Sequence, residues 1–222
     1  MKRFWRANSL SIVMLGLFFV AFLFGQAYSG YFESNEDRTQ HGLTPHAFGE
    51  YLRSAHFMEA TMENWESEFL QMGVFIFFTV FLYQKGSAES KDPDKREEVD
   101  RDPRSARDKQ NAPWPVRRGG WILKIYENSL SLAFLILFLG SFLLHAASGR
   151  SEYNEEQVLH GGNAVSVAGY MGTSRFWFES FQNWQSEFLA IGCMVIFSIW
   201  LRQRGSPESK PVDAPHSETG AG

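Results

Sequence analysis

The chain has 222 residues, a formal net charge of −4 and one cysteine, Cys193. The negative charge argues against a nucleic-acid partner. The single cysteine excludes an intrachain disulfide and a Cys-based metal site. Aromatic residues make up 16% of the chain, and the apolar residues are concentrated in four blocks. Because a membrane-crossing helix needs roughly 20 mainly apolar residues, these blocks predict an all-α integral membrane protein.

The first apolar block predicts a membrane helix near the N-terminus. Its basic start would also fit a cleaved signal peptide. However, the sequence Asn8–Ser11 recurs at 128–131, inside the chain, which favours a retained helix. We therefore expect a first unit, 1–84, with a membrane helix at about 8–28, an outer loop at 29–55 and a long helix at about 56–84 that includes the second span.

The middle of the chain is charged, contains proline and has few apolar residues, which predicts a flexible linker. The second half repeats the order of the first, and the last residues are typical of a disordered tail. We expect a cytoplasmic linker at 85–120, then a second unit, 121–205, with a membrane helix at about 123–147, an outer loop at 148–173 and a helix at about 174–203, then a cytoplasmic tail at 206–222.

An internal repeat relates the two units. Residues 26–91 align with 145–210 at a constant offset of 119, without a gap and with 25 identities. Because each copy holds two spans, both copies should have the same orientation in the membrane. The predicted fold class is therefore an integral membrane four-helix bundle made of two parallel-oriented helical-hairpin repeats, with helical extensions on the outer side.

Basic residues are distributed unevenly along this pattern. Seventeen Lys and Arg lie in residues 1–6, in 85–127 and after Leu201, whereas four lie in the two long loops. Because cytoplasmic segments carry the excess of Lys and Arg, we expect both termini and the linker inside, and the loops outside.

Two acidic residues are expected near the outer edge of the hydrocarbon. Glu68 lies 17 residues above Lys85, and Glu187 lies 15 above Arg202, which is about 25 and 22 Å along a helix, short of a core of about 30 Å. Ionisable groups at that depth are functional candidates by default. The favoured interpretation is nevertheless structural, with the glutamates reaching water and Asn and Ser forming hydrogen bonds between helices. Four more side chains lie one turn earlier or at a similar depth. The candidate site therefore comprises Glu68, Glu187, Asn64, Asn183, His145 and Gln26.

The outer loops share a His-Gly pair, at His41 and His160. A turn or packing role before glycine is the favoured interpretation, and metal ligation is the alternative, since Glu and His together suit a divalent ion. The spacing matches no known metal signature, so no metal site is predicted. Trp65 and Trp184 are expected at the membrane interface, where aromatic belts lie.

The duplicated Asn-Trp-x-Ser-Glu-Phe element, the His-Gly pair in each outer loop and the chain length resemble those of a bacterial multi-pass membrane-protein family known only as a domain of unknown function. The resemblance covers nearly the whole chain apart from the linker and tail. It implies a multi-pass protein of the bacterial inner membrane, which is therefore the expected location, and it implies no reaction, cofactor or partner.

Three functions are compatible with these features. The first is a non-enzymatic structural or interaction module with an ordered outer cap, whose partners are the lipid bilayer and another copy of itself or another membrane protein. The second is a transporter or channel-like protein in which Glu68 and Glu187 handle protons or cations. The third is a membrane enzyme that uses the outer His and Glu groups. No cofactor is expected, because the sequence lacks a phosphate-binding loop and His145 has no second intramembrane histidine with which to hold a b-type haem. A nucleophile elbow is also absent.

Overall fold

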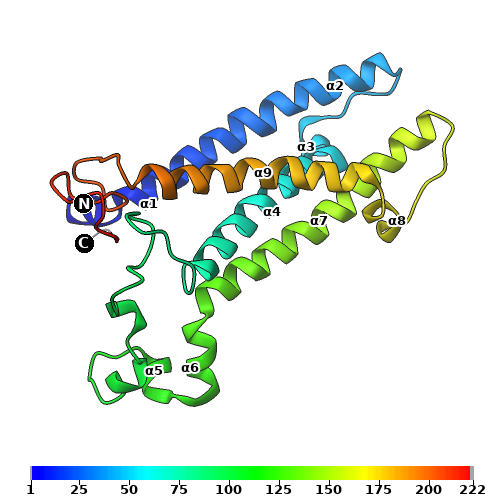
Figure 1. The fold of residues 1–222 in the computed structure, drawn as a ribbon. Coiled ribbons are helices and arrows are strands. Elements are labelled where there is room, and N and C mark those ends of the chain that lie inside the picture. The colour runs from blue at the N-terminus through cyan, green and yellow to red at the C-terminus, as the bar shows by residue number, and fades with distance from the viewer. Residues whose placement is uncertain (1, 221–222) are drawn as a thin grey trace. The chain divides into compact units, whose positions relative to one another are not determined.

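The computed structural model describes residues 2–220, and within that range it is all-helical, without a strand (Figure 1). The chain divides into two compact units. Unit 1 comprises Met1–Met62 and Leu144–Thr173, and unit 2 comprises Glu63–Leu143 and Ser174–Gly222. The long helices α4 and α7 contribute residues to both units.

Unit 1 contains one long helical segment from each sequence repeat. Its other elements are short helices that follow the two segments. The elements are α1 (Lys2–Val20), the π-helix η1 (Ala21–Ser29), α2 (Gly30–Gln40), α3 (Phe48–Tyr51), the start of α4 (Ala55–Phe78), the end of α7 (Ser129–Leu159) and α8 (Val167–Met171).

The π-helix η1 lies where the first copy of the repeat has one extra residue. Asn8 matches Asn128 at an offset of 120, whereas Gln26 matches His145 at an offset of 119. A π-helix closes its hydrogen bonds over five residues instead of four, so it holds one more residue per ring than an α-helix. The insertion is therefore taken up inside the helix.

Two buried tyrosines pack in the same way in the two copies. Tyr51 and Tyr170 are 2% and 0% exposed. A Cβ atom added at Gly30 would clash with the Tyr51 hydroxyl, and one at Gly149 would clash with the Tyr170 hydroxyl. Both glycines are identical in the repeat. The absence of a side chain at these two positions lets each tyrosine ring reach the helix backbone.

Unit 2 holds the remaining helices. Its apolar packing includes contacts between Phe69 and Phe134, whose ring centroids are 6.4 Å apart, and between Phe138 and Trp184, at 6.1 Å. The elements are the rest of α4, η2 (Glu98–Asp100), η3 (Pro103–Ala106), α5 (Trp114–Arg118), α6 (Gly120–Glu127), the start of α7 and α9 (Ser174–Phe197).

The turns that follow α4 and α9 have the same local structure. The amide of Gln84 donates to the Ser90 hydroxyl, and the amide of Gln203 donates to the Ser209 hydroxyl, both at 2.9 Å. The copies then differ. Lys210 is 1% exposed, and its ammonium donates to four backbone carbonyls, those of Gly86, Pro215, His216 and Glu218.

The helices differ in length from the sequence expectation by the same amount in both copies. The first helical segment continues to Gln40 and α7 continues to Leu159, each twelve residues beyond the predicted end. These extensions are polar, but they contain no proline, and their one glycine each, Gly30 and Gly149, lies within the helix, so the next glycines are those of the His-Gly pairs. By contrast, α4 and α9 end at Phe78 and Phe197, six residues earlier than expected.

Two of the described helices are long and apolar enough to cross a membrane, Arg3–Gln40 and Ser129–Leu159. The sequence predicted four spans. Within the described residues, the α4 and α9 helices are not long and apolar enough to cross a membrane by the same measure. Glu59, Glu63 and Glu66 interrupt the first half of α4, and both helices end before their apolar runs do.

Candidate functional site

The repeated His-Gly pairs end two long helices in unit 1. The ring N–H groups of His41 and His160 donate to the carbonyl oxygens four residues earlier, at 3.0 and 2.8 Å. The glycines that follow have φ angles of 71° and 74°. A left-handed glycine just after a helix is the usual way to stop it. Both histidines therefore take part in a helix stop.

Two repeated asparagines fix the chain after these stops. Asn35 exchanges two hydrogen bonds with the backbone of His46, at 2.7 and 3.0 Å. Asn154 makes the same pair with the backbone of Val165, at 2.8 and 3.0 Å. Each amide side chain thus ties a loop to its helix across eleven residues. The loops of unit 1 are consequently ordered rather than simple connectors.

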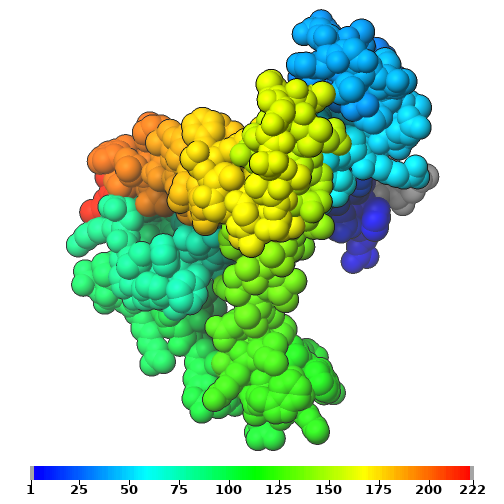
Figure 2. All heavy atoms as spheres, turned by 90° about the vertical axis from the view of Figure 1, so that its right-hand side faces the viewer, coloured from blue at the N-terminus to red at the C-terminus, as the bar shows by residue number. Residues whose placement is uncertain are grey.

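A polar cavity of about 370 Å³ lies within unit 1. Its lining comes from both copies of the repeat, and three equivalent pairs contribute to it. Figure 2 views the molecule from the side on which α2, in blue, and the end of α7, in yellow, face the reader. The charged and histidine residues of the lining are Glu33, Asp37, Glu152, Glu155, Glu156, His41, His46, His56, His160, Arg38 and Arg53.

The cavity is acidic, with five carboxylates against two guanidinium groups. Burial, and then the charges of Glu33 and Glu152, raise the pKa of Tyr51 to about 12. Glu33 also approaches His56, with 3.5 Å between Oε2 and Nε2. The Nδ1 atom of His56 is buried and has no hydrogen-bond partner among the described residues. The field in this part of unit 1 therefore favours positive charge.

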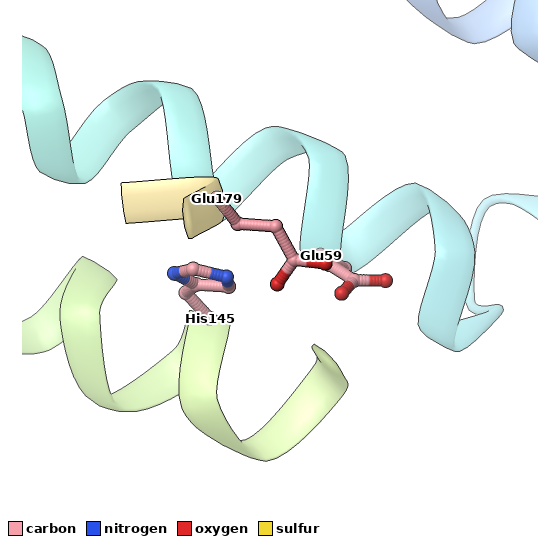
Figure 3. A group of neighbouring side chains, drawn as sticks. All are labelled: Glu59, His145 and Glu179. Carbon is pink, nitrogen blue, oxygen red and sulfur yellow. The ribbon is translucent and has the colours of Figure 1, made fainter. Parts of the chain in front are cut away.

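A second polar group in unit 1 is buried. Glu59 on α4 is 7% exposed and His145 on α7 is 0% exposed. Figure 3 shows both side chains, and their ligand atoms lie within 4.8 Å of each other. Tyr170 donates its hydroxyl to Glu59 Oε1 at 3.3 Å. Glu179, also drawn in Figure 3, belongs to unit 2. A buried carboxylate beside an imidazole can hold or pass a proton.

The residues selected from the sequence are divided between the two units. Gln26, His145, His41 and His160 belong to unit 1, and Gln26 donates to the Thr61 hydroxyl at 2.9 Å. The other candidates belong to unit 2: Glu68, Glu187, Asn64, Asn183, Trp65 and Trp184.

In unit 2 the two repeated glutamates lie near each other. Glu68 is exposed on α4 and Glu187 is half-buried on α9, and their carboxylates are close enough to repel. The amide of Asn183 donates to Glu63 Oε1 at 2.7 Å, and the indole of Trp184 donates to Glu66 Oε1 at 3.1 Å.

Three glutamates of α4 were not selected from the sequence: Glu59, Glu63 and Glu66. Sequence identity between the copies directed attention to Glu68, which is repeated as Glu187. The three glutamates are not repeated: the second copy has Phe178, Gln182 and Gln185 at these positions. The sequence does hold a signal that could have identified these three residues. Each is a carboxylate that occurs in only one copy, on a helix that otherwise matches well between the copies.

Comparison with curated proteins and with solved structures gives no match. Comparison with known families matches residues 1–221 to the family described as Domain of unknown function (DUF6766). The match covers both units, including the polar cavity and the charged segment before α7. The chain therefore belongs to this family of unknown function.

Proposed function

We propose that the chain is a multi-pass protein of the bacterial inner membrane, built as a four-helix bundle from two parallel repeats. The exposure of the two helices that are long and apolar enough to cross a membrane supports this location. In the 18-residue apolar stretches of Arg3–Gln40 and Ser129–Leu159, only 6% and 17% of the residues are buried. A core helix of a soluble protein would be mostly buried, and contiguous exposed apolar surface of this size is unusual in water.

The proposed topology follows the basic residues. The termini and the segment 85–120 face the cytoplasm, and the ordered loops of unit 1 form a cap on the outer side. The matching Asn35 and Asn154 bonds support a duplicated cap, because equivalent residues of the two copies make equivalent contacts.

The cap, in this proposal, binds a small organic cation. The observation that carries it is the acidic cavity, where carboxylates from both copies line one space with a volume of about 370 Å³. Small-molecule sites have volumes of roughly 300–1,000 Å³. Because the loops are held by their asparagine and His-Gly contacts, ligand binding would need little further ordering.

The arrangement favours an organic amine over a directly bound metal ion. Among the described residues that line the cavity, no three His or carboxylate ligand atoms lie within 4.8 Å of one another. The lining carboxylates come instead from two helices, α2 and the end of α7. A molecule with several ammonium groups, such as a polyamine, matches separated acceptors with separated donors.

Calorimetric titration of the purified protein in detergent with spermidine tests this function. The double variant Glu33→Gln/Glu152→Gln should lose about tenfold or more in affinity, because hydrogen bonds to charged groups contribute about 1.5–3 kcal/mol each. Glu36→Gln is the matched control, because Glu36 is a neighbouring exposed acid on α2 that does not line the cavity. Spermidine binding that is absent, or equal in all three proteins, would overturn the proposal. Tighter binding of Zn²⁺ or Mg²⁺ would assign the cavity to a metal ion instead.

A second candidate function is proton handling by Glu59 and His145. Their burial and proximity favour it, because ionisable groups on membrane helices are costly and are usually functional. In reconstituted vesicles with a pH-sensitive dye, Glu59→Gln should abolish a proton flux. The earlier hypothesis places that flux on Glu68 and Glu187, so Glu68→Gln/Glu187→Gln is the contrasting variant. If neither flux nor ligand binding occurs, the structural or interaction role of the cap is the remaining proposal.

A further inference from the structure

A small helical cluster precedes α7 in unit 2. The short helix α5 packs against both η3 and α6, and Val116 and Leu123 are buried, at 7% and 5% exposure. Gly119 and Gly120 have φ angles of 70° and 63°, which favour glycine and separate α5 from α6. The cluster is drawn in green in Figure 1, where α5 and α6 are labelled.

The cluster exposes large aromatic side chains. Trp114 is 60% exposed and Trp121 is 71% exposed. Ile125 and Tyr126 on α6 are also exposed. Meanwhile Val116 and Leu123 fill the interior, so the tryptophans are not needed for the cluster's own packing. Exposed apolar groups gathered on one small element indicate a surface that meets an apolar partner.

Basic side chains accompany these aromatics. Residues 102–127 carry six Lys or Arg and three Asp or Glu. Arg104, Arg107 and Lys124 line a cavity of about 590 Å³ together with Trp121 and one acid, Glu127. Arg104 also pairs with Asp102, at 3.0 Å between Nε and Oδ1, so the cavity carries a small net positive charge beside an aromatic wall. Guanidinium groups recognise phosphate through paired hydrogen bonds.

The position in the chain determines where the cluster can lie. The α6 helix ends at Glu127, and α7 begins at Ser129, where the apolar segment that can cross a membrane starts. One residue separates them, so α6 cannot move far from the point at which α7 would enter the bilayer. Amphipathic segments with Trp and basic residues lie in the interface between lipid headgroups and acyl chains.

We propose that η3, α5 and α6 form a docking surface for anionic phospholipid on the cytoplasmic face. The tryptophans enter the headgroup region, and Arg104, Arg107 and Lys124 bind the lipid phosphate. This inference rests on the proposed membrane location. Anionic phospholipid is the favoured partner because the surface is both cationic and aromatic, whereas a soluble anion would need no exposed tryptophan.

The test uses the full-length protein in detergent, titrated with phosphatidylglycerol or phosphatidylcholine in mixed micelles, with retained lipid counted by native mass spectrometry. Phosphatidylglycerol should be retained preferentially. Each basic residue near an anionic membrane surface contributes enough for about a fivefold change in affinity. We therefore expect Arg104→Gln/Arg107→Gln/Lys124→Gln to lose on the order of a hundredfold in affinity.

The matched control is Lys95→Gln/Arg96→Gln/Arg101→Gln, which removes three exposed charges of the same segment from outside the cavity. It should retain the preference. Quenching of tryptophan fluorescence by brominated phosphatidylglycerol should fall in Trp114→Ser/Trp121→Ser. Equal losses in the two charge variants would overturn the inference, as would binding of inorganic phosphate that displaces the lipid at equal concentration.

The membrane location and the docking surface can be disproved separately. If the chain fractionates with soluble proteins without detergent, the proposed membrane location is wrong. If it fractionates with membranes but retains both lipids equally, only the docking surface is wrong.

Discussion

The indole N–H of Trp184 donates to the carboxylate of Glu66 at 3.1 Å, and Glu66 is 0% exposed. Hydrogen bonds to charged groups contribute about 1.5–3 kcal/mol. We expect Glu66→Ala to lower the free energy of unfolding by that amount, measured by thermal or denaturant unfolding in detergent. Glu68→Ala, two residues later on an exposed position, should change it by less than about 0.5 kcal/mol.

The pairing itself can be isolated with a double-mutant cycle of Glu66→Ala and Trp184→Phe. Coupling between the two substitutions should account for much of the loss. Strictly additive effects would show that the hydrogen bond contributes little and that Glu66 acts through other contacts.

Gly30 and Gly149 should not tolerate a side chain. The added methyl group of Gly30→Ala meets the Tyr51 hydroxyl, and overpacking of this kind costs about 1–3 kcal/mol. Tyr51→Phe should restore most of the stability of Gly30→Ala. Gly25→Ala is the control, since a Cβ there meets nothing within 4 Å, and it should leave the melting temperature unchanged or slightly raised.

The second copy should respond less completely to the same rescue. A Cβ at Gly149 meets Glu59 Oε1 at 2.7 Å as well as the Tyr170 hydroxyl. Tyr170→Phe should therefore recover only part of the stability that Gly149→Ala loses. Full recovery would mean that the Glu59 carboxylate moves aside without cost.

The asparagine contacts predict where the cap opens. Asn35→Ala removes two hydrogen bonds to the backbone of His46, at a cost of about 1–3 kcal/mol. Hydrogen exchange should then accelerate at the amide of His46, while Glu36→Ala should leave that amide protected. Asn154→Ala should have the same effect at Val165. Unchanged exchange in the asparagine variants would show that the loops are held by other contacts.

Alkaline pH should weaken the cap through Tyr51. Its pKa is about 12 in the folded chain against an ordinary value of 10.0. Above pH 10 the unfolded chain releases the phenolic proton while the folded chain keeps it, so stability is full below pH 10 and falls as pH rises towards 12. The difference in melting temperature between the parent and Tyr51→Phe should shrink over that window. Phenolate absorbance attributable to Tyr51 that appears near pH 10 would contradict the burial.

The sequence predicts well the helical character of the chain and the two helices that are long and apolar enough to cross a membrane. Helices have a clear signature where apolar residues are dense and glycine and proline are rare. The same reasoning stops the first and third helices at Tyr28 and Ala147, because the following residues are polar. Those residues nevertheless continue the helix to the His-Gly pairs, since polarity alone does not end a helix and a left-handed glycine does.

The polar contacts were harder to anticipate, because each depends on packing between distant segments. Repetition directed attention to the His-Gly pairs, and the structure gives them local backbone contacts. The equally repeated Asn35 and Asn154 were not selected, and the structure gives them matching backbone contacts as well. Repetition also drew attention to Glu68 and away from Glu59 and Glu66. Only packing brings Glu59 to Tyr170 and Glu66 to Trp184, and no pattern within either helix specifies those partners.

The widened ring of η1 has a consequence for everything that follows it. In an unbroken α-helix, one additional residue would rotate all later side chains by about 100° around the axis. Gly30 would then turn away from Tyr51, and Gln26 would leave Thr61. The π-helix cancels that rotation locally, so the first span can be one residue longer than its counterpart while both copies keep the same angular phase at the cap. Removing one residue between Ser11 and Gln26 should accordingly yield a straight α-helix with the cap contacts preserved.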